Sequence, residues 1–457
     1  MAYDFLRIAE RMIATPSVTS DGTAELVDFL GRAVVPHLPG EAVVLAEPDG
    51  RDVSLLVIVP GRATAPPLLL NSHLDTVPPG DRRTWTSTGG NPYRPRLDGD
   101  RLIGLGTADA KLDWLCKAEA VRLAAGNGLR RPIYFLGTHG EERGLLGARS
   151  FVDRGFPRPA AALVGEPTEL KLVTQHKGLL VGQLRLVTEP QAVSENGLTT
   201  RRRRYRGRSA HSATPEHGDN AILKCLDEIV DETPVVAIHG GDAANKVAAW
   251  CDLEVASTRR RKRAEGDLPP VPPPRLMSPA LLAAARDFAG ALMVLAQRQG
   301  REDAAFAPSR LTANIGRIEG RCSSLSVTFD VRCLPGDDSA AVRRQLETIR
   351  KELEHRYAGL TAQIEIERDN APLSAAPRSL VDVALGVMES IGLPRVVTTK
   401  AGCTEAGVYA GAGIPSVVFG AGRSAGNIHA PNECTSLKQL AQAVQFYAAF
   451  IGAFCRD

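Results

Sequence analysis

The N-terminal third of the chain alternates amphipathic stretches with short apolar runs. In the amphipathic stretches, apolar residues recur at helical spacing, which predicts helices packed by one face, at residues 5–12, 24–34 and 113–125. The apolar runs are bounded by turn residues, which predicts buried strands, at residues 54–59, 67–70 and 133–136. Strands that alternate with helices predict an α/β fold, in which a mainly parallel sheet is flanked by helices.

The pattern changes after about residue 180 and changes back near residue 396. Between these points, strand-like runs are accompanied by two predicted helices, at residues 219–229 and 339–356. Such a mixture predicts a small α+β domain inserted into the larger one. We therefore expect a catalytic domain formed by residues 1–180 and 372–457, with the inserted domain at residues 181–371.

The composition is that of a globular protein with room for two domains. The chain has 457 residues, of which 44% are hydrophobic and 23% charged. The net charge of +3 gives no reason to expect nucleic acid, and the sequence predicts neither a membrane span nor a signal peptide. Eight scattered cysteines without a Cys-x-x-Cys pair argue against a thiolate zinc site and a disulfide framework. We expect a cytoplasmic, reduced protein.

Positive charge is concentrated in two arginine-rich runs, at residues 201–204 and 259–263. The second run opens a proline-rich segment, 259–274, which predicts a surface excursion because proline disrupts helices and central strands. Both runs are consistent with solvated loops. The alternative is that they recognise an acidic substrate or an acidic carrier protein.

Five short polar motifs follow apolar or glycine-rich segments of the predicted catalytic domain. They contain His73 with Asp75, Asp109, Glu141 with Glu142, Glu166, and His429. The carboxyl ends of parallel strands are where open α/β sheets place their ligand sites. Each motif taken alone is typical of an ordinary loop or cap. Together they supply histidines and carboxylates repeatedly at strand ends, which favours a metal centre.

Two of the motifs have a specific physical rationale. His73 and Asp75 lie on the same side of an extended chain, so the carboxylate can orient the imidazole as a metal ligand. The adjacent acids Glu141 and Glu142 are unfavourable side by side unless a cation neutralises one of them. The other acid is then available to take a proton from water that a metal activates.

The order and the residues of these motifs resemble those of the dinuclear zinc hydrolases, over roughly residues 5–450. That family includes acetylornithine deacetylase, succinyl-diaminopimelate desuccinylase, aminoacylase, carboxypeptidase G and related dipeptidases. The resemblance implies a zinc-peptidase-like catalytic domain and an inserted domain that serves as lid and dimerisation domain. It also implies a homodimer with two divalent metal ions, zinc or alternatively cobalt.

The resemblance assigns a ligand set to the two ions. It implies that His73 and Glu166 bind one ion, that Glu142 and His429 bind the other, and that Asp109 bridges both. All of these ligands are nitrogen or oxygen donors, which suits zinc.

Further roles follow from the same resemblance. It implies that Glu141 is the general base and that Asp75 stands behind His73. In the inserted domain, His211 matches a lid histidine that polarises the scissile carbonyl. Asn245 and Arg332 match substrate-binding positions, Arg332 for a substrate carboxylate.

The expected reaction is hydrolysis of an amide bond in a small N-acyl amino acid. The string Cys403-Thr-Glu405 is close to that of acetylornithine deacetylases, whereas Leu105 and Leu112 depart from the family pattern near Asp109. The alternatives are a dipeptidase or carboxypeptidase with the same site, a deacylase of a specialised metabolite, and a catalytically silent binding protein.

Overall fold

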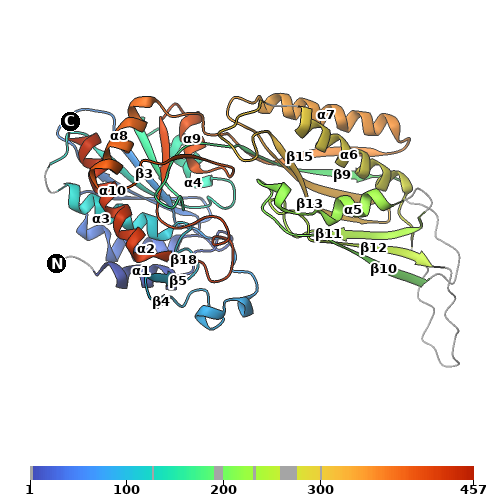
Figure 1. Cartoon of the computed structure of the whole chain (residues 1–457), viewed down its shortest axis with the longest axis horizontal. Helices are drawn as coiled ribbons and strands as arrows, with labels where there is room; N and C mark the ends of the chain where they lie inside the picture. Colours follow the sequence, from blue (N-terminus) through green and yellow to red (C-terminus); the bar gives the residue numbers. More distant parts are fainter. Residues whose placement is uncertain are drawn as a thin grey trace. The chain divides into compact units, whose positions relative to one another are not determined.

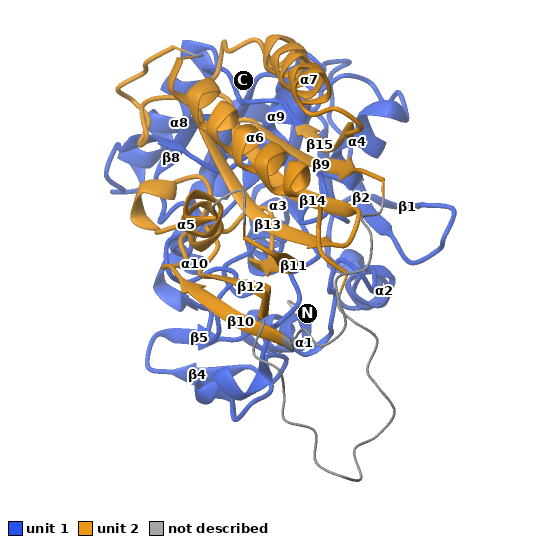
Figure 2. Ribbon diagram, turned by 90° about the vertical axis from the view of Figure 1, so that its right-hand side faces the viewer, with its two compact units in different colours: residues 1–176, 370–457 blue, residues 177–369 orange. Residues whose placement is uncertain are grey.

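The computed structural model divides into two compact units. It describes residues 4–125, 128–189, 199–229, 233–257, 275–298 and 301–456. Unit 1 comprises Met1–His176 and Asn370–Asp457, and unit 2 comprises Lys177–Asp369 (Figure 2). The arginine-rich run at 259–263 lies outside the described residues.

Unit 1 is built on an eight-stranded sheet with the order β1-β2-β6-β3-β7-β17-β8-β16. The strands are β1 (Glu41–Ala46), β2 (Val53–Val59), β3 (Leu68–His73), β6 (Ile133–Thr138), β7 (Ala161–Gly165), β8 (Leu172–His176), β16 (Val397–Lys400) and β17 (Ser416–Phe419). The central strands β6, β3, β7 and β17 are parallel. The pair β16–β8 is also parallel, whereas β1–β2, β2–β6 and β17–β8 are antiparallel, so the sheet is mixed with parallel pairings in the majority. Its α/β class is as the sequence predicts.

Successive side chains of a strand point to opposite faces of the sheet, so both faces carry apolar residues. Helices cover both of these faces. Leu68 and Leu70 belong to the same hydrophobic core as residues of α1, α2, α3, α8 and α10, whereas Leu69 belongs to the core that includes residues of α4 and α9. The helices are labelled in Figure 1. The helices are α1 (Phe5–Ala14), α2 (Ala24–Ala33), α3 (Lys111–Ala125), α4 (Leu146–Asp153), α8 (Arg378–Ser390), α9 (Glu405–Gly411) and α10 (Leu437–Cys455). A small sheet of β4 (Arg96–Asp98), β5 (Arg101–Ile103) and β18 (Cys434–Ser436) completes the unit.

Unit 2 has a seven-stranded sheet with the order β10-β12-β11-β13-β14-β9-β15. The strands are β9 (Leu179–Val187), β10 (Thr199–Arg206), β11 (Val235–Gly240), β12 (Trp250–Ser257), β13 (Thr312–Arg321), β14 (Ser324–Arg332) and β15 (Thr361–Asn370). Its helices are α5 (Ala221–Glu228), α6 (Pro279–Arg298) and α7 (Ser339–Arg356). The first and last of them match the two helices that the sequence predicts.

Helix α6 is the longest of the helices that the sequence pattern does not reveal. It is apolar around most of its circumference, and residues such as Leu281, Phe288 and Leu292 are buried in the core of unit 2. Among the described residues it is also the one helix long and apolar enough to cross a membrane by length and composition. Its packing on the sheet of unit 2 accounts for that composition without a membrane.

Candidate metal centre

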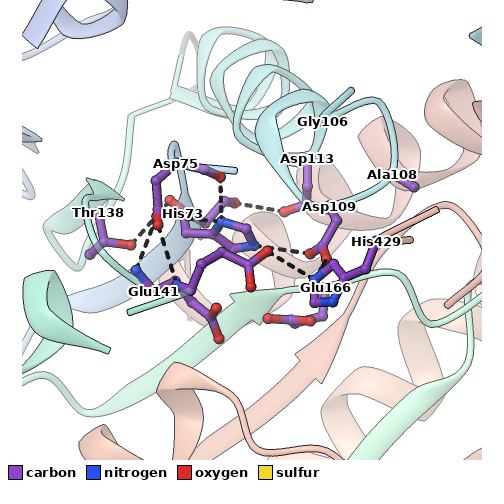
Figure 3. Close-up of polar contacts among 12 residues, drawn as sticks. His73, Asp75, Gly106, Ala108, Asp109, Asp113, Thr138, Glu141, Glu166 and His429 are labelled. Atoms are coloured by element: carbon purple, nitrogen blue, oxygen red, sulfur yellow. Dashed lines mark hydrogen bonds and ion pairs between the residues drawn. The ribbon is translucent and has the colours of Figure 1, made fainter. Parts of the chain in front are cut away.

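Three neighbouring parallel strands of unit 1 end at the same edge of the sheet and carry candidate ligands. β3 ends at His73, β7 is followed directly by Glu166, and β6 is followed by the turn with Glu141 and Glu142. The register pairs His73 with Thr138, the last residue of β6. The sheet therefore brings residues that are far apart in sequence to one place (Figure 3).

Asp109 reaches this edge from the loop that leads into α3. Gly106 in this loop has φ +85, and an added Cβ would lie 2.5 Å from the Lys111 side chain, so no larger residue fits. The buried carboxylate of Glu433 accepts hydrogen bonds from the backbone N–H groups of Gly106 (3.1 Å), Ala108 (2.8 Å) and Asp109 (3.1 Å). These bonds fix the backbone that presents Asp109.

The structure gathers the candidate ligands into two groups that share Asp109. The potential ligand atoms of each group lie within 4.8 Å of one another; the first group is His73, Asp109 and Glu166, and the second is Asp109, Glu142 and His429. Asp109 Oδ1 lies 3.1 Å from His73 Nε2, and Asp109 Oδ2 lies 3.1 Å from His429 Nε2. Because its two oxygens face different groups, Asp109 has the geometry of a bridging carboxylate.

Asp75 supports both His73 and the acid pair. Its carboxylate accepts hydrogen bonds from the backbone N–H groups of Glu141 (3.0 Å) and Glu142 (3.2 Å). The Nδ1 atom of His73 lies 3.0 Å from the main-chain oxygen of Asp75, but 3.7 Å from its carboxylate. The main chain of Asp75 thus makes the closer contact to the imidazole, and the carboxylate holds the turn of the two glutamates.

Burial and the crowding of carboxylates shift the pKa values of the cluster. Burial raises the pKa of Glu141 well above its ordinary value, and neighbouring carboxylates add to this shift. Burial lowers the pKa of His429, but Glu142 and Asp109 outweigh it and raise the pKa to about 11. The pKa of His73 is likewise raised, because hydrogen bonds to Asp109 and Asp75 outweigh burial. A site that draws protons onto both histidines is one in which cations are stabilised.

The sequence interpretation missed three charged residues beside these groups, two of them buried and Lys400 half-buried. Lys400, at the end of β16, forms an ion pair with Glu166. Glu433 lies in the quoted His429 motif but received no role. Glu405 begins α9, and burial raises its pKa to about 7. Each of these three residues lies near the end of a helix or strand, which is a signal that the sequence carries. Their partners lie far away in sequence, so the sequence pattern does not reveal the contacts.

The remaining predicted residues belong to unit 2 and lie around Ser212. The backbone N–H of Ala213 donates to Nδ1 of His211 at 3.1 Å, so the neutral ring carries its proton on Nε2. The main-chain oxygen of Asn245 accepts a hydrogen bond from the Ser212 N–H at 3.0 Å. The buried guanidinium of Arg332 bonds to Ser212 Oγ at 3.1 Å and to Asp330, also at 3.1 Å.

A model of the peptidase family M20/M25/M40 matches residues 69–453. Among curated proteins, the acetylornithine deacetylase of Klebsiella pneumoniae (strain 342) is 31% identical over 280 residues. That of Salmonella heidelberg (strain SL476) is 30% identical over 280 residues. Each alignment covers 55% of this chain and 66% of the relative, slightly less than two thirds of the relative's length.

Solved structures share the fold over almost the whole chain. An aminoacylhistidine dipeptidase from Vibrio alginolyticus has a TM-score of 0.64 at 16% identity, covering 99% of this chain and 97% of that chain. The M20 family metallo-carboxypeptidase Sso-CP2 from Sulfolobus solfataricus has a TM-score of 0.63 at 17% identity, covering 99% of each. A dinuclear metal-binding M20 peptidase from Bacillus subtilis has a TM-score of 0.58 at 11% identity, covering 98% of this chain and 96% of that chain. These similarities confirm the predicted fold class.

Removal of divalent cations should lower the thermal stability of the protein, because the clustered carboxylates would then repel one another. Free zinc at about 100 times its Kd should add about 2.7 kcal/mol to the free energy of unfolding per site. Calorimetry with EDTA, and again after zinc is restored, measures this difference. The Asp109→Asn variant, which weakens both groups, is the control and should respond much less. An identical melting curve for metal-free and zinc-loaded wild type would contradict the prediction.

Proposed function

We propose that this chain, which belongs to the peptidase family M20/M25/M40, hydrolyses the amide bond of an N-acyl amino acid. The observation that carries the proposal is the pair of ligand groups that share Asp109, with the half-buried acid Glu141 next to them but in neither group. Similarity to acetylornithine deacetylases supports a deacylase within a family of metallohydrolases that act on amide bonds.

We propose that His73, Asp109 and Glu166 hold one divalent cation and that Asp109, Glu142 and His429 hold the other. The donors are nitrogen and oxygen atoms only, and each group offers three residues, which fits zinc with open positions and also cobalt. Two bound cations would polarise the amide carbonyl and make a water molecule more acidic.

Glu141 is the proposed general base and acid. Its backbone is held by Asp75, so its position does not depend on a metal bond. Burial and the neighbouring Glu142 raise the pKa of Glu141, which increases its affinity for a proton. In the proposed reaction Glu141 accepts a proton from the attacking water and then delivers it to the leaving amine, so one carboxylate serves both steps.

The proposed roles in unit 2 concern the substrate. His211 carries a proton on Nε2 and is suited to donate a hydrogen bond to the oxygen that becomes negative during attack. Asn245 and Arg332 are proposed to bind substrate, as the resemblance implies. The bonds of Arg332 to Asp330 and Ser212 also favour a role in holding the loop that carries His211. A cytoplasmic homodimer stays a prediction.

The variant Glu141→Gln should retain both cations and lose about 10²- to 10⁴-fold in kcat, because the amide cannot accept the proton. Glu142→Gln is the matched comparison at the neighbouring position, and it should lose affinity for one cation. Metal analysis and steady-state kinetics on the same preparations separate the two effects. Near-normal kcat for Glu141→Gln would overturn its role.

A panel of substrates tests the deacylase proposal against the dipeptidase alternative. N-acetyl and other N-acyl amino acids should be hydrolysed with a kcat/KM at least about tenfold above that of unblocked dipeptides, a difference of about 1.4 kcal/mol in transition-state stabilisation. Assays use the zinc- and cobalt-loaded full chain. Preference for dipeptides would favour the alternative, and loaded protein that hydrolyses neither class would favour a silent binding protein.

An acidic carrier protein that presents the amino acid is a second candidate substrate, favoured by strand β10. Its four consecutive arginines, 201–204, are exposed, and Arg202 and Arg204 pair with Asp252. If β10 attracts an acidic carrier, KM for an N-acyl amino acid attached to a polyglutamate peptide should rise between about 50 and about 500 mM salt. The free N-acyl amino acid and the variant Arg201→Gln/Arg203→Gln are the controls. A KM independent of salt would count against the carrier.

A further inference from the structure

Two charged residues of α3 are completely enclosed in unit 1 behind the first ligand group. Asp113 and Lys117 lie one helical turn apart, and they are 5% and 0% exposed. Lys117 Nζ lies 2.6 Å from Asp113 Oδ2. Burying two charges is unfavourable unless every donor and acceptor is satisfied. The hydrogen bonds of the pair therefore indicate which parts of the fold it holds.

The three N–H groups of the Lys117 ammonium have three acceptors. They are Asp113 Oδ2, the main-chain oxygen of Asn71 at 2.7 Å and Ser72 Oγ at 3.0 Å. Ser72 in turn donates its hydroxyl proton to Asp113 Oδ2 at 2.7 Å. The hydroxyl of Tyr447 on α10 contacts the other oxygen, Asp113 Oδ1. The pair thus joins α3, the end of β3 and α10 through a fully satisfied network.

Several of these contacts lie close in sequence to residues of the first ligand group. Ser72 directly precedes His73, and Asp113 lies in the first turn of α3, which follows the loop that carries Asp109. Gly165 directly precedes Glu166, and a Cβ added there would lie 1.7 Å from Asp113 Oδ2 and 2.4 Å from Lys117 Nζ. Strand β7 therefore approaches the ion pair so closely that only glycine fits.

The second ligand group is linked to this network less directly, through the shared Asp109 and through Tyr447, whose hydroxyl also donates to the main-chain oxygen of Phe419 at the end of β17 at 2.8 Å. Glu142 follows β6 and His429 follows β17, whereas the hydrogen bonds of Asp113 and Lys117 end on β3, α3 and α10. The first group is also buried throughout, while the His429 side chain is 29% exposed. The ion pair is thus placed to act mainly on the first group, and on the second only through Asp109 and Tyr447.

Stability alone does not account for a buried ion pair, because an apolar pair of similar volume is often equally stable or more so. Hydrogen bonds with fixed directions, in contrast, hold backbone and side chains in one position. We propose that Asp113 and Lys117 are positioning residues that set the geometry of the first ligand group, His73, Asp109 and Glu166. The inference rests on the metal centre under Proposed function and adds a reason for the two cations to bind unequally.

The test measures the two metal affinities separately in the full chain. Zinc is titrated against a competing chelator, and the visible spectrum of the cobalt-loaded protein reports ligand geometry. The variants are Asp113→Asn, Lys117→Met and the apolar double variant Asp113→Leu/Lys117→Met. We expect one of the two affinities to fall about 10- to 100-fold, as when partners behind metal ligands are lost, with a clearly smaller loss at the other, which shares only Asp109 with the first group. The cobalt spectrum should change as well.

Glu119→Gln is the matched control, because it removes a partly exposed ion pair with Arg122 from the same helix. It should leave both affinities and the spectrum unchanged. If a single variant does not fold because one buried charge has lost its partner, the metal affinities are measured on the apolar double variant instead. Tyr447→Phe, which removes only one hydroxyl, is a milder variant and should give a smaller loss at the same cation.

Folded variants with wild-type affinities and spectrum would overturn the inference, and so would an equal loss at both sites. Failure of the proposed metal centre is distinguishable, because it would appear in the wild type as binding of fewer than two cations. Lower thermal stability with unchanged metal affinities would show that the pair has only a structural role.

Discussion

The shared carboxylate of Asp109 is the constraint on which the rest of the site depends. One oxygen must face His73 while the other faces His429, so the loop before α3 tolerates little displacement in any direction. Glu433 fixes this loop from one side through three backbone N–H groups. The start of α3, which Asp113 anchors, fixes it from the other side. A bridging ligand thus requires support from two distant parts of the sequence.

The same constraint explains why so many charges are buried at one edge of the sheet. The four carboxylates of Asp109, Glu141, Glu142 and Glu166 would repel one another strongly without compensation. Lys400 compensates one of them through its bond to Glu166. The raised pKa values of both histidines show that this compensation is incomplete. The remaining demand for positive charge is what a pair of divalent cations would meet.

The sequence predicts the parts of this structure that are encoded locally. Periodicity predicts α7 and the strand ends, and the strand ends place the histidines and carboxylates near one another. It does not predict α6, because the side of this helix that faces away from the core is also largely apolar and no polar face marks it. It also misses Glu433 and the Asp113–Lys117 pair, whose partners lie elsewhere in the chain. The antiparallel pairings of β1, β2 and β6 also depend on contacts between separate strands, so the sequence pattern does not predict them.

The geometry of unit 1 defines chemistry more closely than substrate. A bridging carboxylate and an unligated acid suit hydrolysis of any amide that reaches them, whether the amine released is an amino acid or a shortened peptide. The residues proposed to recognise the substrate, His211, Asn245 and Arg332, lie in unit 2 around Ser212. There Arg332 already satisfies Asp330, so a substrate carboxylate would have to compete with a buried partner. Binding of a carboxylate by Arg332, as proposed, would therefore cost the free energy of loosening its bond to Asp330.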